Sequence, residues 1–271
     1  MKTVSISIFI LTLIVFAITS LSSEELHKNI SQSEKLLSLF KNSKELPNII
    51  ILGKPGAGKS TLSKKLCRQY NYVHLSIGDI HRNECRSKTM IGLKIQKNGK
   101  NKDFFNEEMI QITRELLDKR FDEIYQNNQR FILDNFPTDL KYLPYMQEVI
   151  DRYQLKNRII LIVPEVTDIT AKKRVFSRTI CSNMSCNQVY SLDNKKFSSK
   201  KPGICNQCGY KLIQRLDDKG ENWLNIEKLW KEKMFTYEKS ILPVIKHLIK
   251  SKKVETFIIL PSSTLFSNNN R

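Results

Sequence analysis

The sequence predicts an α/β fold of the P-loop type, a three-layer architecture in which a parallel sheet of about five strands is flanked by helices. Short apolar runs alternate with stretches of helical periodicity, which is typical of a parallel sheet covered on both faces. A glycine-rich loop follows the first apolar run and opens a helical stretch. A cysteine-containing segment at 179–214 interrupts the alternation and predicts a small inserted domain.

Five short segments rich in β-branched and aromatic residues are the expected strands. They cover 48–52, 72–76, 131–134, 159–163 and 256–260. The stretches between the first four are long enough for crossover helices, and residues 61–70 have helical periodicity. We therefore expect one domain at 48–260, followed by a polar tail at 261–271.

The glycine-rich loop has the pattern Gly-x-x-x-x-Gly-Lys-Ser, which is typical of phosphate binding. Glycines allow backbone N–H groups to surround phosphate oxygens, because a Cβ would block that approach. We expect Lys59 to reach the terminal phosphates of ATP and the Ser60 hydroxyl to ligate Mg²⁺. The expected ATP-binding residues of the loop are Gly53, Pro55, Gly56, Ala57, Gly58, Lys59, Ser60 and Thr61.

Four cysteines form two clusters inside the 179–214 insertion, Cys181-x4-Cys186 and Cys205-x2-Cys208. Four thiolates can close a tetrahedral structural zinc site, which is the interpretation we favour. Disulfide pairing is the alternative. The apolar run near the N-terminus is typical of secreted chains, in which disulfides form more readily than in cytosolic proteins.

The glycine loop, with Pro55 and Ala57 inside it, resembles the adenylate kinase form of the motif, and four later motifs resemble that family in the same order. The resemblance runs from 48 to 246. It implies an ATP-dependent nucleoside monophosphate kinase that uses Mg²⁺, with an acceptor-binding region at 79–108 and a long lid at 179–214. The longer lids of this family hold zinc, although their first cysteine pair is Cys-x2-Cys.

The resemblance also implies roles around the acceptor. Arg82 lies in a segment similar to Gly-Asp-x-x-Arg, whose arginine holds the acceptor phosphate. Asp134 precedes a segment similar to the family's Phe-Pro motif and would orient the magnesium shell through water. The implied acceptor-site residues are Gly78, Asp79, Arg82, Phe136 and Pro137.

Two arginine-containing segments resemble the entry to and the exit from the family's lid. In the resemblance, Arg174 stacks near adenine and Arg178 meets phosphate, while Arg215 stabilises the transferring phosphoryl group and two aspartates help to close the lid. Arginines suit this chemistry because a guanidinium matches the geometry of phosphate oxygens. The implied catalytic residues are Lys59, Arg174, Arg178, Arg215, Asp217 and Asp218.

The departures from the family pattern lie on the acceptor side. Thr138 and Ile226 stand where the family has arginines, and Tyr142 stands where a glutamine reads the base. Asn135 replaces a glycine and Ile77 replaces a threonine. These changes leave a second hypothesis open, a catalytically degenerate relative that binds nucleotide in a regulatory role.

The formal charge of +18 suits anionic partners. The lysines are scattered, and the sequence has no arginine-rich tract and no aromatic ladder between basic residues, so we expect small-molecule nucleotides and no specific nucleic acid. We also expect a monomer.

The N-terminus resembles a secretory signal, because Lys2 precedes an apolar run at 4–21. We expect a signal peptide or an uncleaved signal anchor at 1–22, followed by a polar linker or targeting extension at 23–47. Both forms direct the chain to the secretory pathway or to an organelle reached through it, with membrane contact only through the apolar run.

Overall fold

The structure of the protein is a computed structural model. It describes residues 31–32, 34–36, 38–41, 46–100, 106–155, 159–183, 185–186, 188–215, 218–219, 223–252 and 254–259. The expected signal segment and the polar tail lie outside the described residues, as does Asp217. No helix within the described ranges is both long enough and apolar enough to cross a bilayer.

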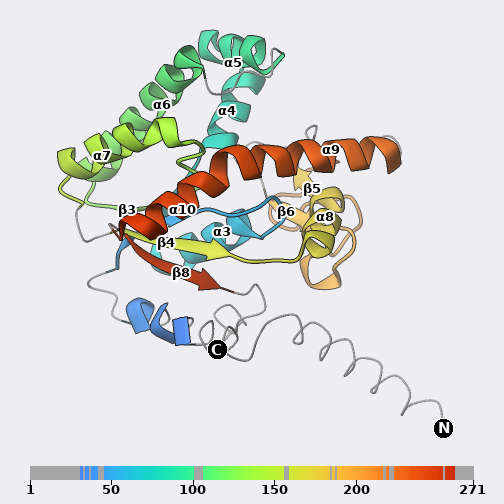
Figure 1. Cartoon of the computed structure of the whole chain (residues 1–271). Coiled ribbons are helices and arrows are strands. Elements are labelled where there is room, and N and C mark those ends of the chain that lie inside the picture. Colours follow the sequence, from blue (N-terminus) through green and yellow to red (C-terminus); the bar gives the residue numbers. More distant parts are fainter. Residues whose placement is uncertain are drawn as a thin grey trace.

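Five strands form one parallel sheet in the order β2-β3-β1-β4-β8 (Figure 1). Their bounds are β1 (Asn48–Ile51), β2 (Tyr72–Ser76), β3 (Arg130–Asp134), β4 (Ile159–Pro164) and β8 (Glu255–Ile259). Each begins and ends within one residue of the range that the sequence predicts. The predicted α/β class is confirmed.

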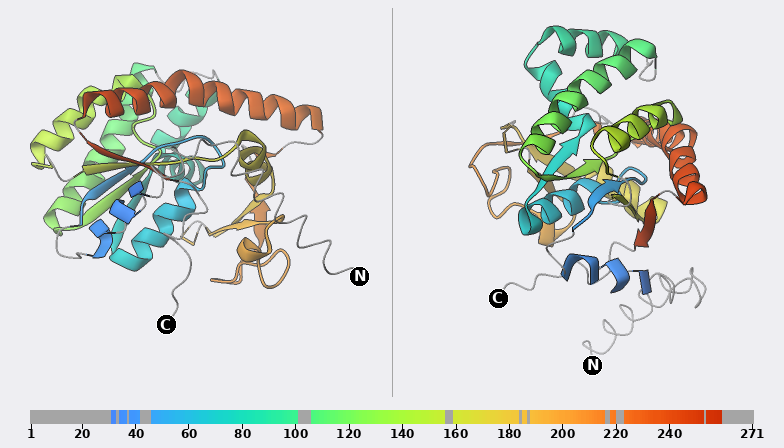
Figure 2. Two further views of the ribbon diagram at one scale, coloured as in Figure 1. Left: turned by 60° about the horizontal axis from the view of Figure 1, so that its bottom comes forward. Right: turned by 90° about the vertical axis from the view of Figure 1, so that its left-hand side faces the viewer.

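Helices cover both faces of this sheet (Figures 1 and 2). The helices are α3 (Lys59–Tyr70), α4 (Ile77–Arg86), α5 (Met90–Lys100), α6 (Glu107–Gln126), α7 (Leu143–Arg152), α8 (Asp168–Phe176), α9 (Trp223–Thr236) and α10 (Leu242–Ser251), with short turns at η2 (Leu140–Tyr142), η3 (Lys195–Phe197) and the π-helical η5 (Tyr237–Ile241). Side chains alternate between the faces of a strand. Ile50 accordingly packs with α6, α7 and α10, whereas Ile49 and Ile51 pack with α3.

The 179–214 insertion contains a second, antiparallel sheet of order β6-β5-β7. Its strands are β5 (Arg178–Cys181), β6 (Val189–Ser191) and β7 (Leu212–Gln214). This sheet lies beside α8, away from the main sheet (Figure 1). Arg178 begins β5, and Arg215 directly follows β7. Both arginines therefore stand where the inserted sheet joins the main domain.

Helical residues at 31–41 pack against the main sheet, although they belong to the segment expected to be a linker or targeting extension (Figure 2). Leu36 and Phe40 are buried in the same core cluster as Ile49. The Gln32 Oε1 atom accepts a hydrogen bond of 2.8 Å from the Ile258 N–H on the edge strand β8. Lys35 Nζ lies 2.6 Å from Glu255 Oε1. These contacts cover the open edge of the sheet.

Replacing Leu36 with Ala is expected to lower the free energy of unfolding by about 2 to 4 kcal/mol, because the change leaves a cavity under the helix. Loosening of the helix also removes the acceptor for the Ile258 N–H, so this amide should exchange faster with solvent. Urea unfolding and amide hydrogen exchange measure the two effects. The matched control is Lys41→Ala at an exposed position of the same helix. Unchanged stability and exchange in Leu36→Ala would contradict the packing described.

Candidate active site

The glycine loop joins β1 to the N-terminus of α3. Gly58 precedes the helix with φ 89°, a left-handed conformation that suits glycine. Gly56 has φ 78°, and a Cβ at this position would lie 2.2 Å from the carbonyl oxygen of Ala171 on α8. The loop is therefore held between α3 and α8, with its N–H groups at the positive end of the α3 dipole.

Lys59, the first residue of α3, folds back over the loop. Its Nζ donates hydrogen bonds to the carbonyl oxygens of Gly53, at 2.8 Å, and Lys54, at 3.0 Å. Burial lowers the pKa of Lys59 to about 8, with further lowering from Arg178 and Arg215 and partial compensation from Asp134. The charges of Arg178, Arg215 and Asp134 therefore all act on this lysine.

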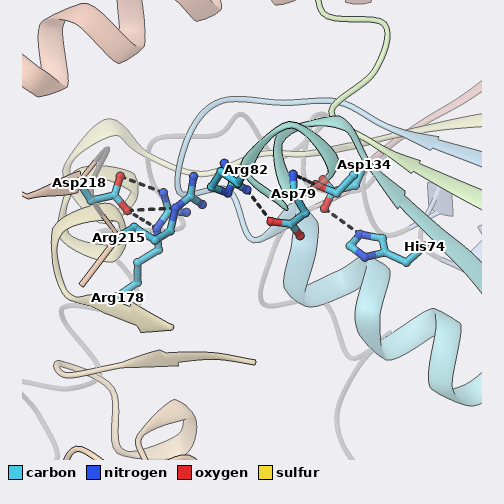
Figure 3. Close-up of polar contacts among 8 residues, drawn as sticks. His74, Asp79, Arg82, Asp134, Arg178, Arg215 and Asp218 are labelled. Carbon is cyan, nitrogen blue, oxygen red and sulfur yellow. Dashed lines mark hydrogen bonds and ion pairs between the residues drawn. The ribbon is translucent and has the colours of Figure 1, made fainter. Parts of the chain in front are cut away.

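Asp134 is buried at the end of β3, opposite Ser76 of β2. The Nε2 atom of His74 lies 3.0 Å from Asp134 Oδ2 (Figure 3). Sequence reasoning missed His74, which lies on β2. Its spacing of two residues from Ser76 was the available signal, because residues i and i+2 of a strand point to the same side. His74 fixes one oxygen of the carboxylate expected at the magnesium site.

Arg82 forms an ion pair within its own helix, with Nη2 2.5 Å from Asp79 Oδ1 (Figure 3). The guanidinium lies over Gly78, where a Cβ would be 3.1 Å from Arg82 Nη1. A side chain at Gly78 would thus crowd Arg82. The structure brings together the three residues that the Gly-Asp-x-x-Arg motif predicts, at the carboxyl end of β2.

Phe136 and Pro137 are buried. The Phe136 ring packs edge-on against Tyr142, with ring centroids 4.9 Å apart. The Tyr142 hydroxyl is buried and donates a hydrogen bond to Thr113 Oγ1 at 3.3 Å. Tyr142 is therefore engaged in the core, where a base-reading glutamine was expected. Asn135, which replaces a glycine, has φ 62°, a conformation that asparagine tolerates better than most residues.

Asp218 is completely buried, with 0 % of its surface exposed, and three cationic side chains lie near its carboxylate. Arg178 approaches both carboxylate oxygens, with Nε 2.5 Å from Oδ2 and Nη2 2.9 Å from Oδ1. Arg215 Nε lies 3.8 Å from Oδ2, and Lys233 Nζ lies 3.0 Å from Oδ1. Figure 3 shows the two arginines between Asp218 and Arg82, which lies on α4. Arg174, the other predicted arginine, is exposed on α8, and partial desolvation of its guanidinium lowers its pKa.

Lys233 is a residue that sequence reasoning missed. We expected the missing arginine at Ile226, but Lys233 lies seven residues later on α9. Seven residues are almost two helical turns, so both positions lie on the same face of the helix. The number of residues between Asp218 and Ile226 did not indicate that the cation would lie at position 233 of α9.

The four cysteines of the insertion lie together, with all four Sγ atoms within 4.8 Å of one another. Cys181 Sγ is 3.3 Å from Cys208 Sγ, and Cys186 Sγ is 3.6 Å from Cys205 Sγ. Four sulfurs bound to one zinc at about 2.3 Å are roughly 3.8 Å apart, whereas a disulfide brings two to about 2.0 Å. The cluster therefore fits a zinc site. The longer Cys-x4-Cys spacing does not prevent this convergence.

Comparison with known proteins gives one consistent result. A family model described as adenylate kinase matches residues 51–253. An adenylate kinase of Thermosipho africanus is 33 % identical over 210 residues, which cover 77 % of this chain and 90 % of that protein. Adenylate kinases of Petrotoga mobilis and Ruminiclostridium cellulolyticum are 30 % and 32 % identical over 208 residues each, covering 77 % and 76 % of this chain and 88 % and 89 % of those proteins.

Proposed function

Because this chain belongs to the adenylate kinase family and is therefore a phosphotransferase, we propose that it transfers the γ-phosphoryl group of ATP to AMP or a related nucleoside monophosphate. The observation that carries this proposal is the convergence of Lys59, Arg178 and Arg215, three cations close enough that the arginines lower the pKa of the lysine. Phosphoryl transfer depends mainly on positioning and on neutralising charge spread over phosphate oxygens.

On the donor side, the loop N–H groups and Lys59 would bind the terminal phosphates of ATP. Lys59 must then leave the carbonyl oxygens of Gly53 and Lys54, which hold it in the free enzyme. Bound Mg²⁺ would neutralise phosphate charge during the reaction. Ser60 and Asp134 suit this ion because Mg²⁺ prefers oxygen ligands, and Asp134 is already oriented by His74.

On the acceptor side, Arg82 would bind the monophosphate. Its guanidinium pairs with Asp79 in the free enzyme, so the incoming phosphate has to compete with this carboxylate. A dianionic phosphate is the stronger partner for a guanidinium. The engagement of Tyr142 with Thr113 leaves the base to be recognised by other groups.

A coupled assay of ADP formation from ATP and each of AMP, CMP, UMP and GMP tests the proposal. We expect turnover with at least one of these acceptors and none without an acceptor. Binding of ATP without ADP formation from any of the four would overturn the proposal. It would instead support the degenerate, nucleotide-binding relative.

Thr138 is the observation that favours the degenerate alternative, because it is half-buried next to Pro137 where the family has an arginine. If phosphate binding is the only defect, Thr138→Arg should lower the acceptor KM about tenfold or more, since one charged hydrogen bond to phosphate is restored. Thr138→Gln is the matched uncharged control. Steady-state kinetics with varied acceptor measure the effect, and an unchanged KM would show that other residues already bind the phosphate.

We further propose that the four cysteines hold a structural zinc ion. Their convergence supports this assignment, and thiolate ligands are those that zinc prefers.

A further inference from the structure

The carboxylate of Asp218 lies close to three cationic side chains. Arg178 and Lys233 are within 3.0 Å of its oxygens, and Arg215 lies 3.8 Å away. One carboxylate therefore faces three cations from different elements, namely β5, the segment after β7, and α9. A single arginine with bidentate contacts would have been sufficient to pair it.

The two arginines have a second task under the proposed function, because they are the cations that act on Lys59 at the phosphate-binding loop. To bind phosphate oxygens, their guanidinium groups have to turn at least partly away from Asp218. A carboxylate with no exposed surface cannot be left without a partner, since an uncompensated buried charge is strongly unfavourable. Departure of the arginines therefore requires a cation that stays.

Lys233 is placed to be that cation. Its Nζ contacts Oδ1, and its side chain is only 19 % exposed. The helix that carries it is attached to α8, since Trp230 packs against Ala171 and Val175. Lys172 of α8 also forms an ion pair with Glu227, on α9. Lys233 is thus tied to the base of the insertion and not to the inserted sheet, whose two ends carry the arginines.

From this arrangement we propose that Lys233 is a positioning residue that keeps Asp218 neutralised while Arg178 and Arg215 exchange between Asp218 and the phosphates of bound nucleotide. The inference rests on the proposed function of the site. Lys233 does not contact the substrate in this proposal. The lysine affects catalysis only by neutralising the charge of Asp218.

The test is a double-mutant cycle with Lys233→Met and Asp218→Asn. Lys233→Met removes the charge of the side chain but keeps most of its volume. Asp218 would then have only the arginines as cationic partners among the residues discussed and should hold them away from the phosphates, so kcat/KM for ATP should fall at least about tenfold. Asp218→Asn in the same background removes the charge that holds them and should recover much of this loss. Lys233→Arg should retain activity. Lys231→Met, at an exposed position of α9, is the control and should match the wild type.

Two results would overturn the inference. The first is wild-type kinetics in Lys233→Met. The second is a double variant no more active than Lys233→Met, which would indicate that the lysine acts directly on phosphate or only on stability. Thermal unfolding of all variants separates the stability effect, because a variant that stays folded at the assay temperature cannot owe its lost activity to unfolding.

The same four proteins, titrated with a non-hydrolysable ATP analogue, test the inference without transfer. If no acceptor supports turnover, the proposed function fails, but the inference still requires weaker analogue binding in Lys233→Met and recovery in the double variant. Equal affinities across the cycle would overturn it independently of the assay.

Discussion

Replacing Lys59 with Met is expected to lower kcat about 10³-fold, because the change removes a cation that would bind the terminal phosphates of ATP. Lys59 is the first residue of α3, and in the free enzyme its ammonium donates hydrogen bonds to the loop carbonyl oxygens of Gly53 and Lys54. Met retains the length and the packing of the side chain, so the fold should persist. Steady-state kinetics and thermal unfolding measure the two properties.

The lowered pKa of Lys59 adds a pH dependence to this prediction. Below about pH 8 the ammonium is protonated and attracts phosphate, whereas above that value the free enzyme loses the proton. Affinity for ATP should therefore fall as pH rises through about 8, and ATP binding above this pH should take up a proton. Lys59→Met should show no such decline, and Lys54→Met, which keeps Lys59, is the matched control. An identical pH profile in wild type and Lys59→Met would contradict the assignment.

The second large effect is expected from the cysteine cluster. Cys205→Ser should abolish stoichiometric zinc and lower kcat about 10²-fold or more, because Arg178 and Arg215 lie at the two ends of the sheet that the cluster holds together. A displacement of about 1 Å in such groups can cost that much. Metal analysis and kinetics measure the two losses, and the main domain should stay folded because its core is separate from the cluster.

Cys85→Ser is the control, because Cys85 lies outside the cluster and its thiol donates only to the carbonyl oxygen of Gly92, which a hydroxyl can also do. It should keep both zinc and activity. Full activity in zinc-free wild-type protein, with thiols that no longer react with alkylating reagents, would instead indicate disulfides.

The strands and the position of the glycine loop could be predicted because their signals are local. A buried parallel strand is a continuous apolar run with clear ends, and the residues of the phosphate loop are adjacent in sequence. The zinc-like cluster was also predictable, since cysteines in two groups can converge whatever the loop between them. In these three cases, the types of residue and their order along the chain are enough to indicate the local structure.

Other features of the structure could not be predicted, because they depend on contacts between residues that are far apart in the sequence. Lys233 was missed because its role depends on the length and register of α9. The burial of Tyr142 follows from Thr113, a partner 29 positions away. The burial of Leu36 and Phe40 against the main sheet was not predicted either, because a few apolar residues in a polar segment do not indicate which surface they will cover.

The packing of the helical residues between 31 and 41 also limits how far the N-terminal side can be shortened without loss of these contacts. A protease that cuts before Ser31 leaves Gln32 in place to accept from the Ile258 N–H. A cut ten residues later removes that acceptor together with the side chain of Leu36. The edge of β8 and the apolar surface that Leu36 covers would then be exposed to solvent. Trimming of the chain beyond Ser31 should therefore destabilise the fold and favour aggregation through the exposed strand edge.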